Sequence, residues 1–201
     1  RKKEQAAGSN YEVAMVAIDP DNGYIKALVG GKDYDASQVN MATGTGGSGR
    51  QAGSSFKTFT LVAAIEQGID PSTMIDASAT AKLPGWEVAN INHTNYGTKS
   101  ISDAFAVSSN TAFARLILSI GPDKVVDVAK RMGITSPLTA TGSLTLGSES
   151  VTPLEMANAY ATIANGGTHY DPECVERIVD RNGSIVVDNS APKGTRAISA
   201  E

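Results

Sequence analysis

The most constraining feature of this sequence is segment 54–67, an apolar helical pattern that opens with Ser54-Ser55-Phe56-Lys57 and is followed by Gly68. Residues three apart lie on one face of a helix, so the Ser54 hydroxyl and the Lys57 amine are expected within hydrogen-bonding reach. Gly68 can adopt the left-handed conformation in which many helices end. The pattern therefore predicts a buried helix that carries both polar groups in its first turn.

This spacing favours an activated serine. A serine hydroxyl is a weak nucleophile unless a neighbouring base takes its proton, and a lysine can do so only when it is neutral. The pKa of an ordinary lysine is about 10.4, and burial lowers it. The apolar Phe56 and Phe59 beside Lys57 can supply that burial, and Gly53 permits a tight entry turn. The first-turn N–H groups favour an oxyanion, and the N–H of Ser54 is one candidate donor.

Ser-x-x-Lys alone is not specific, because a second copy occurs at Ser190-Ala191-Pro192-Lys193, where the proline argues against a helix. Ser-x-Asn occurs once, at Ser108-Ser109-Asn110, between two helical patterns. A structural interpretation makes Ser54 a helix cap, Lys57 a solvated charge and the Ser-x-Asn triplet an ordinary turn. Spacing alone leaves both interpretations open.

The residues around these motifs resemble the transpeptidase domain of class A penicillin-binding proteins. The superfamily carries Ser-x-x-Lys, a Ser-x-Asn element and Lys-Thr-Gly. The likeness runs from about Tyr11 to Val187 and rests on the segments 50–57, 106–111, 146–148 and 157–161, with shorter matches at 18–20, 30–31, 40–42, 66–68 and 164–167.

The resemblance implies an α+β fold of the penicilloyl-serine transferase type, with an antiparallel sheet and helices around it. It implies that Ser54 attacks the carbonyl between the two D-alanines of a peptidoglycan stem peptide while Lys57 accepts the proton. Ser108 would relay that proton to the leaving amine, and Asn110 would hold the peptide amide. A neighbouring stem peptide would then resolve the ester, and β-lactam antibiotics would acylate Ser54. No metal or organic cofactor is implied, and the reaction would take place on the extracytoplasmic face of a bacterial membrane.

One departure from the family concerns the third motif. Lys-Thr-Gly is absent from these 201 residues, and Lys193-Gly194-Thr195 has the right residues in the wrong order. We therefore expect residues 11–201 to be the N-terminal part of one transpeptidase domain, preceded by a linker at 1–10. A complementing C-terminal segment with the Lys-Thr-Gly motif would supply the remaining strands. Without it we expect an incomplete sheet, an exposed edge and poor stability.

Composition fits a folded enzyme piece. With 201 residues and 41% hydrophobic side chains, the chain can bury one sizeable core. A net charge of −4 argues against nucleic acid as the partner, and no apolar run is long enough for a membrane span. Cys174, His93 and His169 lack metal-ligand spacing, so no metal site is predicted.

Turn chemistry and periodicity outline the remaining elements. A first hairpin is expected at 11–18 and 24–29, helices at 102–107, 111–120 and 122–132, and a second hairpin at 175–180 and 185–187. Segment 71–97 shows no sustained period and is expected to be irregular. Its one tryptophan, Trp86, is either a packing anchor for that segment or a weak candidate for substrate contact.

The stretch Glu155-Met156-Ala157-Asn158 superficially matches the Glu-x-x-Asn part of a deacylating β-lactamase loop. Thr152-Pro153-Leu154-Glu155, however, is a capping box with proline at the first helical position, which accounts for the glutamate. Three functions remain open: a transpeptidase, a β-lactam hydrolase, and a β-lactam sensor or inactive fragment.

Overall fold

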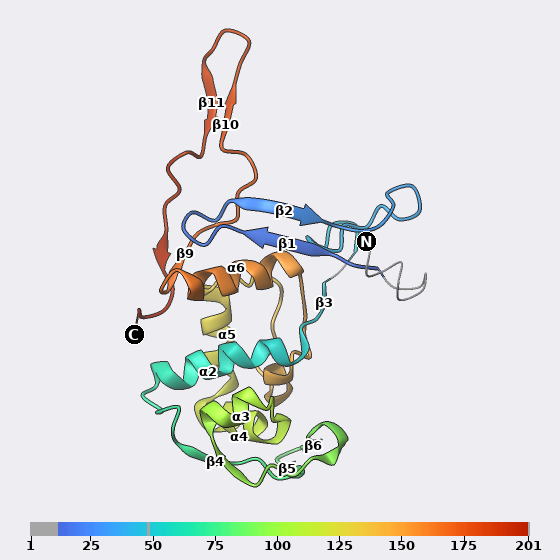
Figure 1. The fold of residues 1–201 in the computed structure, drawn as a ribbon, viewed down its shortest axis with the longest axis vertical. Helices are drawn as coiled ribbons and strands as arrows, with labels where there is room; N and C mark the ends of the chain where they lie inside the picture. The colour runs from blue at the N-terminus through green and yellow to red at the C-terminus, as the bar shows by residue number, and fades with distance from the viewer. Residues whose placement is uncertain (1–11, 48, 201) are drawn as a thin grey trace. The chain divides into compact units, whose positions relative to one another are not determined.

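The structure, a computed structural model, describes residues 12–47 and 49–200, which fall into two compact units (Figure 1). Unit 1 contains the chain up to residue 50 together with residues 130–136 and 151–201, and unit 2 contains residues 51–129 and 137–150. The linker expected at 1–10 lies outside the described residues. All four residues of the predicted serine site belong to unit 2.

Unit 1 is built on an antiparallel hairpin of β1 (Met15–Ile18) and β2 (Ile25–Val29), which confirms the first predicted hairpin. Helix α6 (Pro153–Ala164) lies against β1 (Figure 1). The helix begins with the predicted capping box, in which Thr152 and Glu155 hydrogen-bond to each other's backbone N–H. The expected α+β class is confirmed.

Within the described ranges every sheet is two-stranded, and that a further segment completes one of them stays a prediction. Val13 and Met15 at the first strand, and Leu28 on the second, are exposed apolar side chains.

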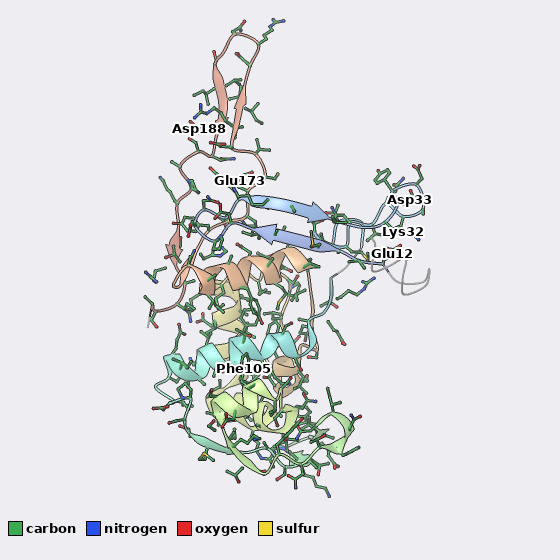
Figure 2. All side chains as sticks on the ribbon, in the orientation of Figure 1. Glu12, Lys32, Asp33, Phe105, Glu173 and Asp188 are labelled. Carbon is green, nitrogen blue, oxygen red and sulfur yellow. The ribbon has the colours of Figure 1, made fainter. Side chains whose placement is uncertain are left out.

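The second predicted hairpin is also present, as β10 (Arg177–Val179) and β11 (Ile185–Asp188). Glu173 and Asp188 lie on the two arms at its base (Figure 2). Further along, β9 (Thr168–His169) pairs with β12 (Thr195–Arg196). Two further short strands, β3 (Arg50–Gln51) and β8 (Ser150–Val151), each have one residue in unit 1 and one in unit 2.

Unit 2 is mainly helical. The 3₁₀ turn η1 (Gly53–Phe56) leads into α2 (Lys57–Glu66), followed later by α3 (Ile101–Ala106), α4 (Asn110–Ile120), α5 (Pro122–Arg131) and the 3₁₀ turn η3 (Gly142–Leu146). The last two residues of α5 belong to unit 1. Helices α3, α4 and α5 lie within a residue or two of their predicted bounds, whereas the helix predicted at 54–67 begins as the 3₁₀ turn η1 and becomes α-helical only at Lys57.

The core of unit 2 lies between α2, α4 and η3. Phe59, Ile117 and Leu144 are completely buried there. Phe105 (Figure 2) packs against the buried Phe113 with ring centroids 5.7 Å apart. The core fixes α2 against the start of α4, which is where the two sequence motifs lie.

The expectation that segment 71–97 is irregular is wrong. Strand β4 (Met74–Asp76) pairs with β7 (Thr98–Ser100), and β5 (Thr80–Leu83) forms a hairpin with β6 (Trp86–Ala89) before the 3₁₀ turn η2 (Ile91–His93). Each strand has only three or four residues, which is too few to show an alternating pattern in sequence.

Candidate active site

Ser54 lies in the turn that leads into helix α2. Gly53 has φ of 60°, a conformation that favours glycine, so the chain enters the turn sharply. Ser54 is exposed, and its N–H lies in a first turn whose amides lack acceptors within the helix. Lys57 begins α2 and is 1% exposed. The Ser54 hydroxyl is therefore accessible to solvent, whereas the Lys57 amine is buried.

The Lys57 amine contacts both predicted motifs. Its Nζ donates to Ser54 Oγ at 2.8 Å, to Ser108 Oγ at 3.1 Å and to the Ser108 carbonyl oxygen at 2.9 Å. A fourth contact, at 2.7 Å, goes to Asn110 Oδ1. All four partners are neutral. The structure thus brings Ser54, Lys57, Ser108 and Asn110 into one cluster.

The surroundings of Lys57 favour its neutral form. Burial lowers the pKa of the Lys57 amine from 10.5 to about 8, because an ammonium loses its hydration there. Phe56 and Phe59, predicted to supply this burial, are completely buried with ring centroids 4.6 Å apart. At neutral pH part of the population therefore carries an uncharged amine, which can accept a proton.

The Ser-x-Asn triplet forms the turn between α3 and α4. Ser109 caps α4, its Oγ accepting from the N–H of Ala112. Ser108 has φ of 55°, a left-handed conformation that is strained for a residue other than glycine. This conformation lets both oxygens of Ser108 reach Lys57. Asn110 is anchored separately, its Nδ2 donating to the Ala89 carbonyl at 3.0 Å.

The segment after η3 supports the serine turn from the other side. Gly147 has φ of 68°, and a Cβ at this position would overlap the backbone N and O of Gly53. Gln51 Nε2 donates to the Ser148 carbonyl at 2.9 Å. The two segments therefore pack backbone to backbone beside Ser54, and Gly147 has to be glycine for that contact.

Trp86, the weak candidate for substrate contact, is half-buried. It packs against the cluster of Ala81, Val88 and Ala114, and its indole lies close to Gly142. These contacts are those of a packing anchor, and substrate contact by Trp86 stays a prediction. The second Ser-x-x-Lys copy lies in an exposed tail, where the hydroxyl of Ser190 donates to Asp188.

Glu155 is held as a structural group. Its carboxylate accepts the N–H and hydroxyl groups of Thr135, Ser136 and Thr152 at 2.6 to 3.0 Å. Burial alone would raise the pKa of this carboxyl, but these hydrogen bonds outweigh it and lower the pKa to about 2. Both oxygens are occupied, and Oε2 makes the capping-box bond to the Thr152 N–H.

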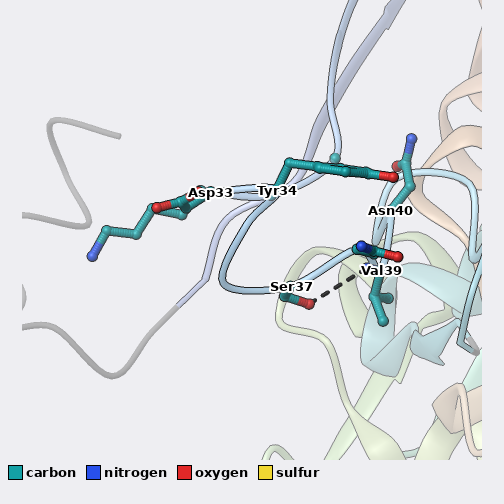
Figure 3. Close-up of a pocket in the computed structure, with 9 residues that line it drawn as sticks. Asp33, Tyr34, Ser37, Val39 and Asn40 are labelled. Atoms are coloured by element: carbon teal, nitrogen blue, oxygen red, sulfur yellow. Dashed lines mark hydrogen bonds between the residues drawn. The ribbon is translucent and has the colours of Figure 1, made fainter.

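Unit 1 also has hollows at its surface, one of about 530 Å³ lined by residues 13, 15 and 28–31. A surface hollow of about 290 Å³ in unit 1 is lined by residues 30–34 and 37–40, with Tyr34 extending toward Asn40 (Figure 3). It contains none of the predicted site residues. Among residues 12–47 and 49–200 there is no cluster of three metal-ligating side chains. Nor is any helix in that part of the chain long and apolar enough to cross a membrane.

Sequence reasoning missed one residue beside the site. Asn90 is 4% exposed and hydrogen-bonds to Ser109 and Thr111 on either side of Asn110. It lies in a polar stretch of sequence, where a buried asparagine has no distinguishing signal. Its partners are 19 and 21 residues away, so only the fold brings them together.

Comparisons with known proteins place this chain in a family. The family model "Penicillin binding protein transpeptidase domain" matches residues 13–201. Penicillin-binding protein 2D of Bacillus subtilis is 38% identical over 190 residues, which cover 91% of this chain and 27% of that protein. Penicillin-binding protein 1A of Mycobacterium tuberculosis is 34% identical over 90% of this chain and 23% of its own length. The chain thus spans about a quarter of these curated relatives.

Solved structures of penicillin-binding proteins agree with this family match. PonA1 of Mycobacterium tuberculosis in complex with penicillin V superposes with a TM-score of 0.85 and 32% identity, over 99% of this chain and 56% of that one. The imipenem acyl-enzyme of penicillin-binding protein A from the same organism gives a TM-score of 0.81 and 27% identity, over 93% and 54% of the two chains. With a family model that spans nearly all of its residues, this chain belongs to the transpeptidase domain family of the penicillin-binding proteins.

Proposed function

We propose that this chain forms the N-terminal, serine-bearing part of a peptidoglycan D,D-transpeptidase domain, which cross-links stem peptides through an acyl-enzyme on Ser54. The observation that carries the proposal is the position of one buried amine, Lys57 Nζ. It lies 2.8 Å from Ser54 Oγ, 3.1 Å from Ser108 Oγ and 2.7 Å from Asn110 Oδ1. A base for the nucleophile and a route for its proton are therefore present in one cluster.

In the first step Ser54 Oγ attacks the carbonyl carbon between the two D-alanines, and its proton passes to the neutral amine of Lys57. The oxyanion is stabilised by the N–H of Ser54 and by a second donor from the downstream segment. The C–N bond then breaks, and Ser108 delivers the proton to the departing D-alanine nitrogen. Asn110 orients the substrate amide and Lys57. An amine of a second stem peptide finally attacks the ester and restores Ser54.

The downstream segment with the Lys-Thr-Gly motif is the proposed partner of this chain. It would bind the substrate carboxylate, because no Lys-Thr-Gly occurs in the 201 residues. β-Lactams would acylate Ser54 as substrate mimics, in line with the penicillin V complex and the imipenem acyl-enzyme of the two mycobacterial relatives. Since peptidoglycan lies outside the membrane, the domain would work on the extracytoplasmic face.

Two other functions are less well supported. A β-lactam hydrolase needs a base that activates water on the acyl-enzyme, but both oxygens of Glu155 are engaged by Thr135, Ser136 and Thr152. A β-lactam sensor would use the same Ser54 and stop at the acyl-enzyme. Nitrocefin separates the hydrolase from the other two functions, because a hydrolase turns it over rapidly whereas a transpeptidase or sensor keeps a persistent adduct.

The decisive experiment is peptide mapping by mass spectrometry after incubation with a fluorescent penicillin, for the chain alone and with the downstream segment. We expect the label on Ser54, and we expect Ser54→Ala to remove it without unfolding the protein. Ser190→Ala, in the second Ser-x-x-Lys copy, is the matched control and should label like the wild type. Label on another residue, or an unlabelled reconstituted domain, would overturn the assignment.

A further inference from the structure

The amide nitrogen of the buried Asn90 side chain joins the loop between β4 and β5 to the residue that follows η2. Asn90 Nδ2 donates to the carbonyls of Ala77 and Ser78 at 3.1 Å each and to that of Thr94 at 3.0 Å. Its own N–H donates to the carbonyl of Ala79 at 2.9 Å. The side chain is 4% exposed, so water cannot readily replace these bonds. Asn90 is therefore anchored by residues outside the Ser-x-Asn turn.

The amide oxygen of the same residue faces the turn. Asn90 Oδ1 accepts from Ser109 Oγ at 3.0 Å, from the Thr111 N–H at 3.1 Å and from Thr111 Oγ1 at 3.3 Å. Ser109 and Thr111 are both completely buried. They flank Asn110, whose Oδ1 contacts Lys57. One carbonyl oxygen thus holds the residues on either side of a predicted site residue.

The Ser-x-Asn turn needs these hydrogen bonds because the backbone of Ser108 is strained. Its left-handed backbone, with φ of 55°, costs of order 1 kcal/mol or more for a residue other than glycine and persists only where the surroundings over-determine it. The neighbouring Ser109 is fixed by Asn90 and caps α4. If this hold were released, Ser108 could relax, and its two oxygens would move away from the amine of Lys57.

We propose that Asn90 is a positioning residue for the serine site: by holding Ser109 and Thr111, it keeps Ser108 and Asn110 against Lys57. Asn90 acts through these residues and touches no reacting atom. The inference rests on the proposed function for its catalytic consequence, but the arrangement around Lys57 can be measured whether or not the site is active.

The test compares Asn90→Ala with Asn165→Ala in the chain supplemented with the downstream segment. Asn165 is a matched control, because its side chain also joins loops through three bonds to backbone groups, those of Pro20 and Thr168, but it lies in unit 1. We expect Asn90→Ala to slow penicillin acylation of Ser54 at least about tenfold, and Asn165→Ala to change it less than about twofold, both measured on folded protein.

The second measurement is the pH dependence of Lys57 modification by acetic anhydride, read by mass spectrometry. In Asn90→Ala the loosened turn admits water to the amine, so the midpoint should rise by about one pH unit, toward that of an ordinary lysine. In Asn165→Ala it should match the wild type. An unchanged midpoint in Asn90→Ala overturns the proposal whatever the acylation rate.

The two measurements separate the two claims. If the wild type is not acylated at Ser54, the proposed function fails, while the midpoint still decides the role of Asn90. If Asn90→Ala does not fold, Thr111→Val takes its place, since it removes only the hydroxyl whose one proton is shared between the Ser78 carbonyl, at 2.8 Å, and Asn90 Oδ1, at 3.3 Å. The same upward shift of the midpoint is expected, and its absence there overturns the proposal.

Discussion

At the scale of single residues, two opposing effects act on the amine of Lys57. Four neutral oxygens lie within hydrogen-bonding distance of its three N–H groups, which favours the charged form, whereas burial removes water and favours the neutral form. Burial is the larger effect, because the pKa falls to about 8. The site therefore combines hydrogen bonds that aim the amine with a protonation equilibrium close to neutral pH.

This equilibrium predicts how acylation depends on pH. The base is active only when neutral, so the acylation rate should rise about tenfold per pH unit below the Lys57 pKa of about 8 and level off above it. Measuring the second-order rate constant of Ser54 with penicillin from about pH 6 to about pH 9.5 tests this. A rate that stays flat between about pH 6 and pH 8 would contradict a lysine base of that pKa.

At the scale of elements, Gly147 sets where the serine turn lies. In Gly147→Ala the new Cβ would overlap the backbone of Gly53, in addition to straining a backbone with φ of 68°. The turn with Ser54 has to move, and we expect acylation to fall at least about tenfold, since small displacements of reacting groups are costly. Stopped-flow acylation with a fluorescent penicillin measures it.

Gly85→Ala is the control for this variant. Gly85 has φ of 81° but open space where a Cβ would lie, so the substitution adds strain of the same kind without a clash. It should lower stability by about 1 kcal/mol and leave the acylation rate of the folded protein unchanged. Equal rates in the two variants would show that the contact between Gly147 and Gly53 does not position Ser54.

Helix α6 yields a prediction about stability. The pKa of Glu155 is about 2 in the folded chain, below that of an unfolded glutamate, so its contribution is fully present above about pH 4.5 and is lost as the pH falls toward about 2. A shift of this size corresponds to about 3 kcal/mol. Urea unfolding at pH 7 should show Glu155→Gln destabilised by about 2 to 3 kcal/mol, with a smaller difference at about pH 3. A difference independent of pH would contradict this.

How much the sequence predicts depends on the range of the contacts. Helices α2 and α4 were predictable because their patterns extend over several turns. The contact between Ser54 and Lys57 was predictable because the two lie three positions apart in a helical stretch, although Ser54 lies in the 3₁₀ turn that precedes α2. The strands within residues 71–97 were not predictable, because each has too few residues to show an alternating hydrophobic pattern. The hydrogen bonds from Ser109 and Thr111 to Asn90 join residues about 20 positions apart. Asn90 lies in a polar stretch, so no local pattern in the sequence indicates these contacts.

At the scale of the whole molecule, the described chain has a helical unit that carries the serine site and a unit whose ribbon, β1 with β2, has exposed apolar side chains. Met15 is 51% exposed and Leu28 is 37% exposed. The chain covers 56% of the PonA1 chain, and the sheets among residues 12–47 and 49–200 have two strands each. These observations fit the proposal that a downstream segment with Lys-Thr-Gly adds strands to this ribbon.

That proposal predicts a linkage between binding and stability. A segment that binds only the folded chain stabilises it by about 2.7 kcal/mol when its concentration is about 100 times its Kd. Titration of the downstream segment should therefore raise the Tm of the chain and slow amide hydrogen exchange in β1 and β2, because new strands cover their exposed edges and side chains.

Leu28→Lys places a charge on this ribbon and should weaken the stabilisation. Ile185→Lys is the matched control, since Ile185 is also an exposed apolar strand residue, at 56%, but lies on the β10–β11 hairpin. If the segment raises the Tm equally for both variants, its strands do not add to the β1–β2 ribbon, and the complementing role proposed for it is wrong.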